Sequence, residues 1–206
     1  MGIFDISNSN LTTLKYVHFP ENVTNLYCSH NQLTSLKHCP ASVTELHCPN
    51  NQLTSLKHCP ASVTELHCRN NQLTSLEHCP ESVTKLCCNN NQLISLENCP
   101  ASVTYLDCRN NRLTSLENCP ESITILCCYN NPLNDKYKDL SLFKIHNINR
   151  EKVFLKGLVI VQKLIQNSMA RRIQQKWRWW FYDDLDSDGI SRFARRSVDE
   201  LNDNIS

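Results

Sequence analysis

Histidine, cysteine and aspartate recur at one position of a repeated segment, and these residue types bind metals or act in catalysis. The row, at intervals of 20 residues, is His47, His67, Cys87, Asp107 and Cys127. Imidazole, thiolate and carboxylate are ligands that zinc takes in proteins. A cysteine, a histidine and an aspartate also supply a nucleophile, a base and an orienting acid. The row therefore raises two hypotheses, a zinc site and a Cys87–His67–Asp107 triad.

The spacing argues against both hypotheses. Side chains that stand in a row on parallel segments do not easily converge on a tetrahedron, and the chain contains no CxxC or HxxxH pair. A Gly-rich phosphate loop is absent too, since the chain has only Gly2, Gly157 and Gly189. The repeated serines and histidines follow the period rather than forming one site. We expect no catalytic set, no bound metal and no cofactor.

A repeat of 20 residues explains why these residues are so regularly spaced. The copy from Leu33 to Gln52 returns at Leu53, Leu73, Leu93 and Leu113, and a copy two residues longer begins at Leu11. A fixed period of this length predicts a solenoid, in which each copy buries its apolar side only against its neighbours.

Each copy reads Val-x-x-Leu-x-Cys-x-x-Asn-x-Leu, as at Val43, Leu46, Cys48, Asn51 and Leu53. Six matches in register resemble the leucine-rich repeat, with cysteine at the second leucine of the strand. The resemblance implies short parallel strands whose solvent side, the concave face, binds ligands. The short repeat is similar to that of secreted effectors of bacterial pathogens. The Cys-rich copies and the Trp-rich tail also look like uncharacterised leucine-rich repeat proteins of giant DNA viruses.

The physical roles of the repeated positions can be argued from the residues. Alternation in Leu-x-Cys places one side of a short strand inward. Asparagines from Asn31 to Asn131 predict a ladder of internal hydrogen bonds at the strand ends. A proline in each return path, from Pro40 to Pro120, excludes a regular helix there. We expect an α/β-type solenoid of six copies, with an extended or 3₁₀ convex side and a C-terminal helical cap.

The charge and the cysteine content limit the classes of protein to which this chain can belong. Residues 1–133 carry 7 Lys and Arg against 10 Asp and Glu, whereas residues 134–206 carry 14 against 10. Eleven of the 13 cysteines fall in two columns of the repeat, where free cysteine acts as a small hydrophobe. The first ten residues have neither a basic nor an apolar signal region. We expect reduced thiols, a cytoplasmic location (host cytoplasm for a viral protein), no transmembrane segment and a monomer.

The solvent side of the strands is the candidate binding surface. Tyrosine and arginine dominate interface energetics, so Tyr27, Tyr105 and Tyr129 are candidate anchors. The alternative is a neutral surface left by recent duplication, since 16 consecutive residues from Leu33 recur from Leu53. The predicted partner-binding residues of this concave face are Tyr27, Glu45, His47, Glu65, His67, Arg69, Lys85, Tyr105, Asp107, Arg109 and Tyr129.

Both ends of the array need covers. Residues 1–10 form the expected N-terminal cap, in which Ile3, Phe4 and Ile6 cover the first copy. Beyond the array at 11–133, helical spacing begins, and an apolar segment at 153–165 suits a helix over the last copy that hides Leu126, Cys128 and Leu133. We expect a helical cap and basic helix over 134–182 and a polar, flexible tail over 183–206.

The segment 165–182 is basic and carries tryptophans at helical spacing, a pattern typical of calmodulin targets or membrane-surface helices. Residues 173–178 resemble the start of an IQ motif, although its glycine and second basic positions are Trp179 and Asp183. The resemblance implies partner contacts from Ile173, Gln174, Trp177 and Arg178. The alternative is that these aromatics fold back on the repeats. Residues 184–189 resemble an EF-hand opening, but Arg195 replaces the required glutamate, so we expect a solvated turn.

We therefore predict a non-enzymatic module that binds a partner protein on its concave face. The second hypothesis is a regulatory binder recruited through helix 165–182 by a calmodulin-like protein or an anionic membrane surface. Nucleic acid is disfavoured as a partner, because one basic helix provides no groove-binding module.

Overall fold

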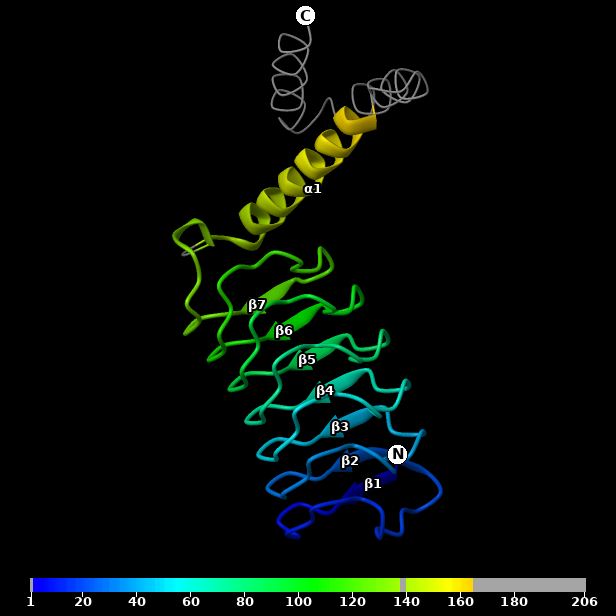
Figure 1. The fold of residues 1–206 in the computed structure, drawn as a ribbon. Helices are drawn as coiled ribbons and strands as arrows, with labels where there is room; N and C mark the ends of the chain where they lie inside the picture. Colours follow the sequence, from blue (N-terminus) through cyan, green and yellow to red (C-terminus); the bar gives the residue numbers. More distant parts are fainter. Residues whose placement is uncertain (1, 138–139, 165–206) are drawn as a thin grey trace, which may run out of the picture. The chain divides into compact units, whose positions relative to one another are not determined.

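A computed structural model describes residues 2–137 and 140–164 of the chain. The chain divides into two compact units, 1–149 and 150–206. The first unit is a stack of coils, each of which contributes one short strand to a single parallel sheet (Figure 1). The strands are β1 (Gly2–Asp5), β2 (Val23–Tyr27), β3 (Glu45–His47), β4 (Glu65–His67), β5 (Lys85–Cys87), β6 (Tyr105–Asp107) and β7 (Ile125–Cys127).

The strands lie in chain order, and their register places equivalent residues of successive copies side by side. Leu46 is paired with Leu26 on one side and with Leu66 on the other. A parallel order without crossovers follows from the period, because every copy returns the chain to the same edge after 20 residues. The sequence prediction of short parallel strands in a solenoid is confirmed.

The core is built from the repeated columns. Val43, Leu46, Cys48, Leu53 and Leu56 are all fully buried, and their equivalents in the next three copies are buried as well. Burial of one leucine side chain stabilises the fold by about 1.5–3 kcal/mol, and the repeat supplies several per coil. All 13 cysteines lie within the described ranges and are free thiols. The buried ones, such as Cys48 and Cys68, act in the core as apolar side chains.

The predicted asparagine ladder is present. Nδ2 of Asn51 donates to the carbonyl oxygens of Cys48 and of Cys28, which belongs to the preceding coil, at 3.1 and 3.0 Å. Its Oδ1 accepts from the backbone N–H of Leu33 at 2.9 Å. Each buried asparagine thus pairs backbone groups that water cannot reach, and it joins two coils.

The return path contains two tight turns per copy instead of a helix. The N–H of Cys39 donates to the carbonyl of Leu36 at 3.0 Å, and that of Val43 to Pro40 at 3.2 Å. His38 has a φ of 72°, as the third residue of a type II turn requires. The same position is His58, His78, Asn98 and Asn118 in the later copies, all with positive φ.

A column of serines forms a second ladder of hydrogen bonds, which was not predicted from the sequence. Oγ of Ser62 donates to the carbonyl of Val43 in the preceding coil at 2.6 Å. Ser82 and Ser102 make the equivalent bond to Val63 and Val83, each at 2.7 Å. The coils are therefore joined by side chains before each strand as well as after it.

The N-terminal segment covers the first copy as a strand of its own. β1 pairs in parallel with β2, and Phe4 packs edge-on against Phe19 with ring centroids 5.6 Å apart. A Cβ on Gly2 would lie 2.0 Å from the carbonyl oxygen of Asn22, so only glycine fits this approach. Phe4 and Ile6 pack against the core as predicted, but Ile3 is 66% exposed and does not.

At the other end, the chain leaves the array through a short 3₁₀ helix, η1 (Asp135–Tyr137), and enters α1 (Leu142–Leu164). Ser141 caps α1, because its Oγ accepts from the N–H of Lys144 at 3.4 Å. Tyr137 and Ile145 are buried in the core cluster with Leu133.

Leu126 and Cys128 are half-buried within the first unit. The predicted cover of the last copy by the apolar segment 153–165 stays a prediction, because that segment belongs to the second unit. The described part of the chain contains no helix that is both long and apolar enough to cross a bilayer.

Candidate functional site

The strand residues that alternate with the buried leucines form a continuous surface, which we call the outer sheet face. Each coil contributes three residues to it. In the coil of β3 these are Glu45 and His47, which flank the strand residue Leu46, and Pro49, two positions further on. All eleven predicted partner-binding residues lie on it: Tyr27, Glu45, His47, Glu65, His67, Arg69, Lys85, Tyr105, Asp107, Arg109 and Tyr129. Their role in binding stays a prediction.

Three rings stack along the outer sheet face. The ring of Tyr27 lies 4.4 Å from that of His47, with planes 17° apart, and His47 lies 4.2 Å from His67, with planes 8° apart. The stack arises because parallel strands bring equivalent positions about 4.8 Å apart. Nε2 of His47 is 2.5 Å from Oε1 of Glu45, which orients the middle ring.

The next charged group joins two strands. Nζ of Lys85 lies 3.0 Å from Oε2 of Glu65, whose other neighbour is Nε2 of His67 at 3.7 Å. The bond from Lys85 holds the pKa of Glu65 below its ordinary value. Burial, together with the nearby His47 and Lys85, lowers the pKa of His67, so this imidazole is neutral at physiological pH.

A third group closes the C-terminal end of the face. Nε of Arg109 donates to Oδ2 of the buried Asp107 at 3.1 Å. Its guanidinium also donates to the hydroxyl of Tyr129 and lies over that ring, with Cζ 5.4 Å from the centroid. Arg109 is thus held by two partners, one on its own coil and one on the next.

Between these groups the surface is hollowed by a cavity of about 310 Å³. It extends over β3 to β6, and its lining is His47, Pro49, His67, Arg69, Cys87, Asn89, Tyr105, Asp107 and Arg109. Six of the nine were predicted from the sequence. Pro49, Cys87 and Asn89 were not, although they occupy the same columns as predicted residues.

The hollow does not have the chemistry of a cysteine nucleophile. Burial and the charge of Asp107 raise the pKa of the Cys87 thiol to about 11, so it is protonated at neutral pH. Nε2 of His67 has no hydrogen-bond partner, so this nitrogen does not accept the thiol proton. Within residues 2–137 and 140–164, no three His, Cys, Asp or Glu side chains are arranged to hold a metal ion.

The outer sheet face also exposes large apolar groups at its end. Ile125 is 52% exposed and Tyr129 is 53% exposed. In the return path, Ile94 is 63% exposed at a position where neighbouring copies carry threonine. Apolar groups that remain in water beside a hollow are typical of a surface that a partner covers.

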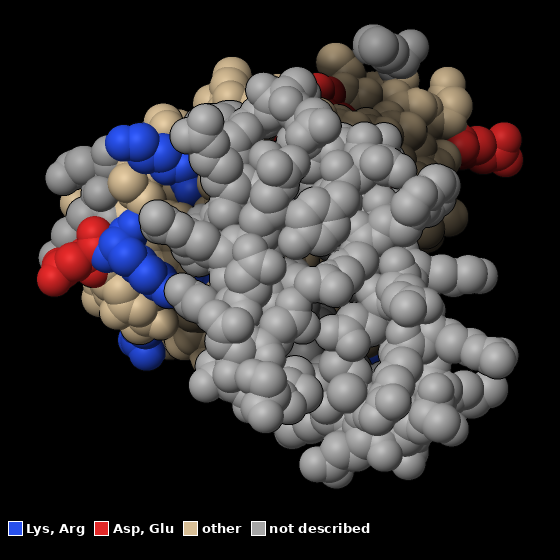
Figure 2. All heavy atoms as spheres, turned by 90° about the horizontal axis from the view of Figure 1, so that it is seen from above, with Lys and Arg blue, Asp and Glu red and all other residues tan. Residues whose placement is uncertain are grey.

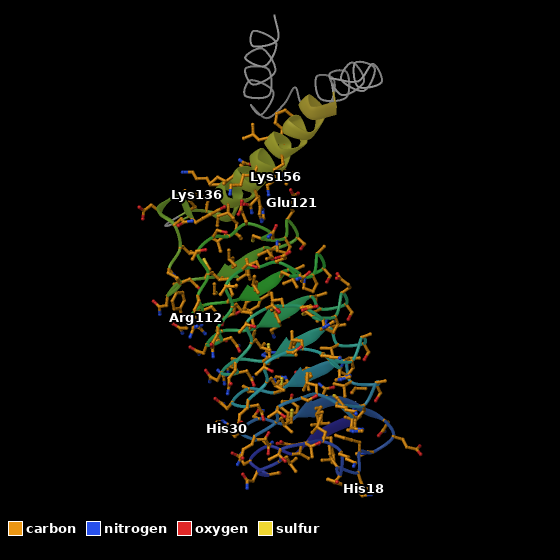
Figure 3. All side chains as sticks on the ribbon, in the orientation of Figure 1. His18, His30, Arg112, Glu121, Lys136 and Lys156 are labelled. Carbon is orange, nitrogen blue, oxygen red and sulfur yellow. The ribbon has the colours of Figure 1, made fainter. Side chains whose placement is uncertain are left out.

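Charges of both signs are interspersed on the described surface. Figure 2 shows Lys and Arg side chains beside Asp and Glu side chains at one margin of the molecule. Arg112 and His30 lie along the edge where the strands end, outside the hollow (Figure 3). The IQ-like residues Ile173, Gln174, Trp177 and Arg178 and the acidic turn at 184–189 lie outside the described residues.

No protein-family model and no curated protein matches the sequence. Among solved structures, YopM from Yersinia enterocolitica WA-314 is similar, with a TM-score of 0.50 and 30% identity over 55% of this chain and 25% of that one. YopM from Yersinia pestis, a leucine-rich effector protein, has a TM-score of 0.49 and 30% identity over 63% of this chain and 38% of that one. The functional domain of InlJ from Listeria monocytogenes, which includes a cysteine ladder, has a TM-score of 0.50 and 25% identity over 70% and 37%.

The similarities to YopM from Yersinia enterocolitica and to InlJ agree with the repeat motif, the parallel sheet and the asparagine ladder. The protein is a leucine-rich repeat solenoid. The chain spans about a quarter to two fifths of the length of the solved proteins that it matches.

Proposed function

We propose that this protein is a non-enzymatic protein-interaction module and that its partner binds the outer sheet face, the concave side of a leucine-rich repeat solenoid. The exposed pair Ile125 and Tyr129 carries the proposal. Neither side chain contributes to the core as the leucines do, and both stand beside a hollow lined by charged and aromatic groups. Aromatic, arginine and apolar side chains around a concavity are the usual anchors of protein interfaces.

The interspersed charges support the same proposal. Glu45, Glu65 and Asp107 each lie beside a basic or imidazole group of the outer sheet face. Such pairs hold side chains in fixed positions, so less freedom is lost when a partner binds. The second hypothesis, recruitment through 165–182 by a calmodulin-like protein or an anionic membrane, stays a sequence-based prediction.

Cross-linking of the full chain in cell extract, followed by mass spectrometry, tests the proposal. We expect the double variant Ile125→Glu/Tyr129→Ala to lose the proteins that the wild type captures, because it removes both exposed anchors. The matched control is Ile94→Thr, which removes an exposed isoleucine from the return path and restores the residue of neighbouring copies. Capture that survives the double variant, or that Ile94→Thr abolishes equally, would contradict the proposal.

A further inference from the structure

The hollow on the outer sheet face carries an excess of positive charge. Its lining includes two arginines, Arg69 and Arg109, but only one carboxylate, that of Asp107. The Cys87 thiol is neutral, as its raised pKa of about 11 requires, and burial also raises the pKa of Tyr105. The two arginines and the Asp107 carboxylate together give the lining one net positive charge.

Arg69 is the source of that excess. Lys85 is paired with Glu65 at 3.0 Å, and Arg109 is paired with Asp107 at 3.1 Å. Within the described residues, Arg69 has no ion pair and no side-chain hydrogen bond, and it is exposed at the margin of the hollow. A guanidinium presents several N–H donors in a planar fork that matches carboxylate and phosphate oxygens.

A second polar atom of the hollow, Nε2 of His67, makes no hydrogen bond in the described structure. It is buried, and Oε2 of Glu65, which lies 3.7 Å away, is already bonded to Nζ of Lys85. A buried polar atom without a partner is costly, and such atoms are usually satisfied by water, an ion or a ligand. In the tautomer that carries its proton on Nε2, His67 donates to an anion.

We propose that this hollow receives an anionic group, a carboxylate or a phosphate, carried by a side chain of the partner protein, and that Arg69 and His67 bind it. The inference rests on the proposed function and adds the chemistry of the bound group. The Asp107 carboxylate does not exclude an anion, because Nε of Arg109 already compensates its charge. The exposed Ile125 lies three strands beyond β4, at about 14 Å by the spacing of parallel strands. The partner segment therefore combines an acidic or phosphorylated residue with an apolar one.

Titration of the full isotope-labelled chain with small anions tests the proposal without knowledge of the partner. The probes are inorganic phosphate and acetate, with acetamide as the uncharged analogue and sodium chloride to hold ionic strength constant. The measurement is the NMR shift of the His67 ring and of the Arg69 Nε–H group. We expect saturable shifts of both signals with phosphate or acetate and none with acetamide. The stronger of the two anions identifies a phosphorylated or a carboxylate side chain as the source.

The variant Arg69→Gln should weaken anion binding about tenfold, because a charged hydrogen-bond donor is lost. The control is Arg112→Gln, which removes an exposed arginine outside the hollow and restores the glutamine of the other copies; it should bind anions as the wild type does. Shifts that stay linear, or that respond equally in both variants, would overturn the proposal.

The two proposals fail separately. If the partner requires Ile125 and Tyr129 but anions do not shift His67, the interaction surface stands and the anion site is wrong. If anions bind at Arg69 but no partner requires the outer sheet face, the proposed function is wrong.

Discussion

Asn71 shows how a single side chain holds neighbouring coils together. Its Nδ2 donates to the carbonyls of Cys48 and Cys68, both at 3.0 Å, and its Oδ1 accepts from the N–H of Leu53 at 2.9 Å. Water cannot take the place of the Asn71 amide, because Asn71 and its surroundings are buried. The contribution of Asn71 to the free energy of unfolding is therefore set by the backbone groups that its loss would leave unpaired.

We expect Asn71→Ala to destabilise the fold by about 1–3 kcal/mol, because it leaves the buried N–H of Leu53 unpaired. The carbonyls of Cys48 and Cys68 each keep one donor, from Asn51 and Asn91. Urea denaturation followed by circular dichroism measures the change. Gln72→Ala is the control, because Gln72 is the adjacent exposed side chain and its replacement should change stability by less than about 0.5 kcal/mol. Equal effects of the two substitutions would show that the ladder does not stabilise the coils.

His67 makes the stability of the fold depend on pH. Its pKa is lowered from the ordinary value of 6.5 in the folded chain, so the unfolded chain takes up the proton first as the pH falls. The contribution of His67 to the free energy of unfolding is fully present above pH 6.5 and decreases as the pH falls below that value. Glu65 acts in a separate window, because its pKa lies below its ordinary value of 4.5.

We expect the stability of the wild type to fall more between about pH 7.5 and about pH 5.5 than that of His67→Gln, which cannot take up the proton. Urea midpoints at the two pH values measure this difference. His58→Asn serves as the control, since His58 is exposed on the return path and asparagine occupies its position in later copies. A wild type and a His67→Gln variant with equal pH dependence would exclude this role of His67.

The type II turns are the elements that allow so short a return path. His38 closes the turn from Leu36 to Cys39 with a φ of 72°, a region that most side chains avoid. Asparagine and histidine enter this region more readily than other residues with a side chain. The column of His and Asn at this position therefore serves the backbone rather than a metal or a catalytic step.

We expect His38→Val to destabilise the protein by about 1–2 kcal/mol, because a β-branched residue is strained at positive φ, whereas His38→Asn should be nearly neutral. Thermal denaturation of the two variants beside the wild type measures the difference. A valine variant as stable as the asparagine variant would contradict the assigned turn.

The strands and the columns of the repeat followed from the sequence because identical residues returned every 20 positions. Leu46, Cys48 and Asn51 had one interpretation that satisfied all six copies. The type II turn at His38 was missed, because histidine is an uncommon choice where glycine or asparagine is expected. The strand Gly2–Asp5 lies outside the repeat, so the period gave no signal for it.

The candidate site was predicted as a surface but not as a set of contacts. Alternation placed Glu45, His47 and Arg109 on the outer side of the strands, as the structure has them. The hollow and the unpaired nitrogen of His67 depend on side-chain rotamers, which the repeat does not determine. The pair of Arg109 and Tyr129 joins two copies of the repeat. The copies differ at these positions, so the pair does not recur every 20 residues and the sequence gives no sign of it.

At the scale of the whole molecule, the array behaves as a sum of coils, each stabilised by its two neighbours. The contacts of the first unit join each coil to the next one through the sheet, the asparagine ladder and the serine ladder. Removal of one complete period should therefore leave every remaining column in register. Removal of half a period should not.

We expect deletion of residues 53–72 to leave a folded solenoid that is one coil shorter. Asn91 would then donate to the carbonyl of Cys48, which takes the place of Cys68 in the preceding coil. Urea denaturation should show a cooperative transition with a lower midpoint and a smaller slope, since less surface is buried. The deletion also removes His67 and Arg69, so inorganic phosphate should no longer bind.

The control deletion, residues 53–62, removes ten residues and brings Val63 to the position of Leu53. Strand and return path are then out of register between the coils before the deletion and those after it, so polar residues meet the core columns at that junction. We expect this variant to lose the cooperative transition. If the 20-residue deletion unfolds the chain as completely as the ten-residue deletion, the coils are not interchangeable, and stability resides in particular copies rather than in the interfaces between neighbours.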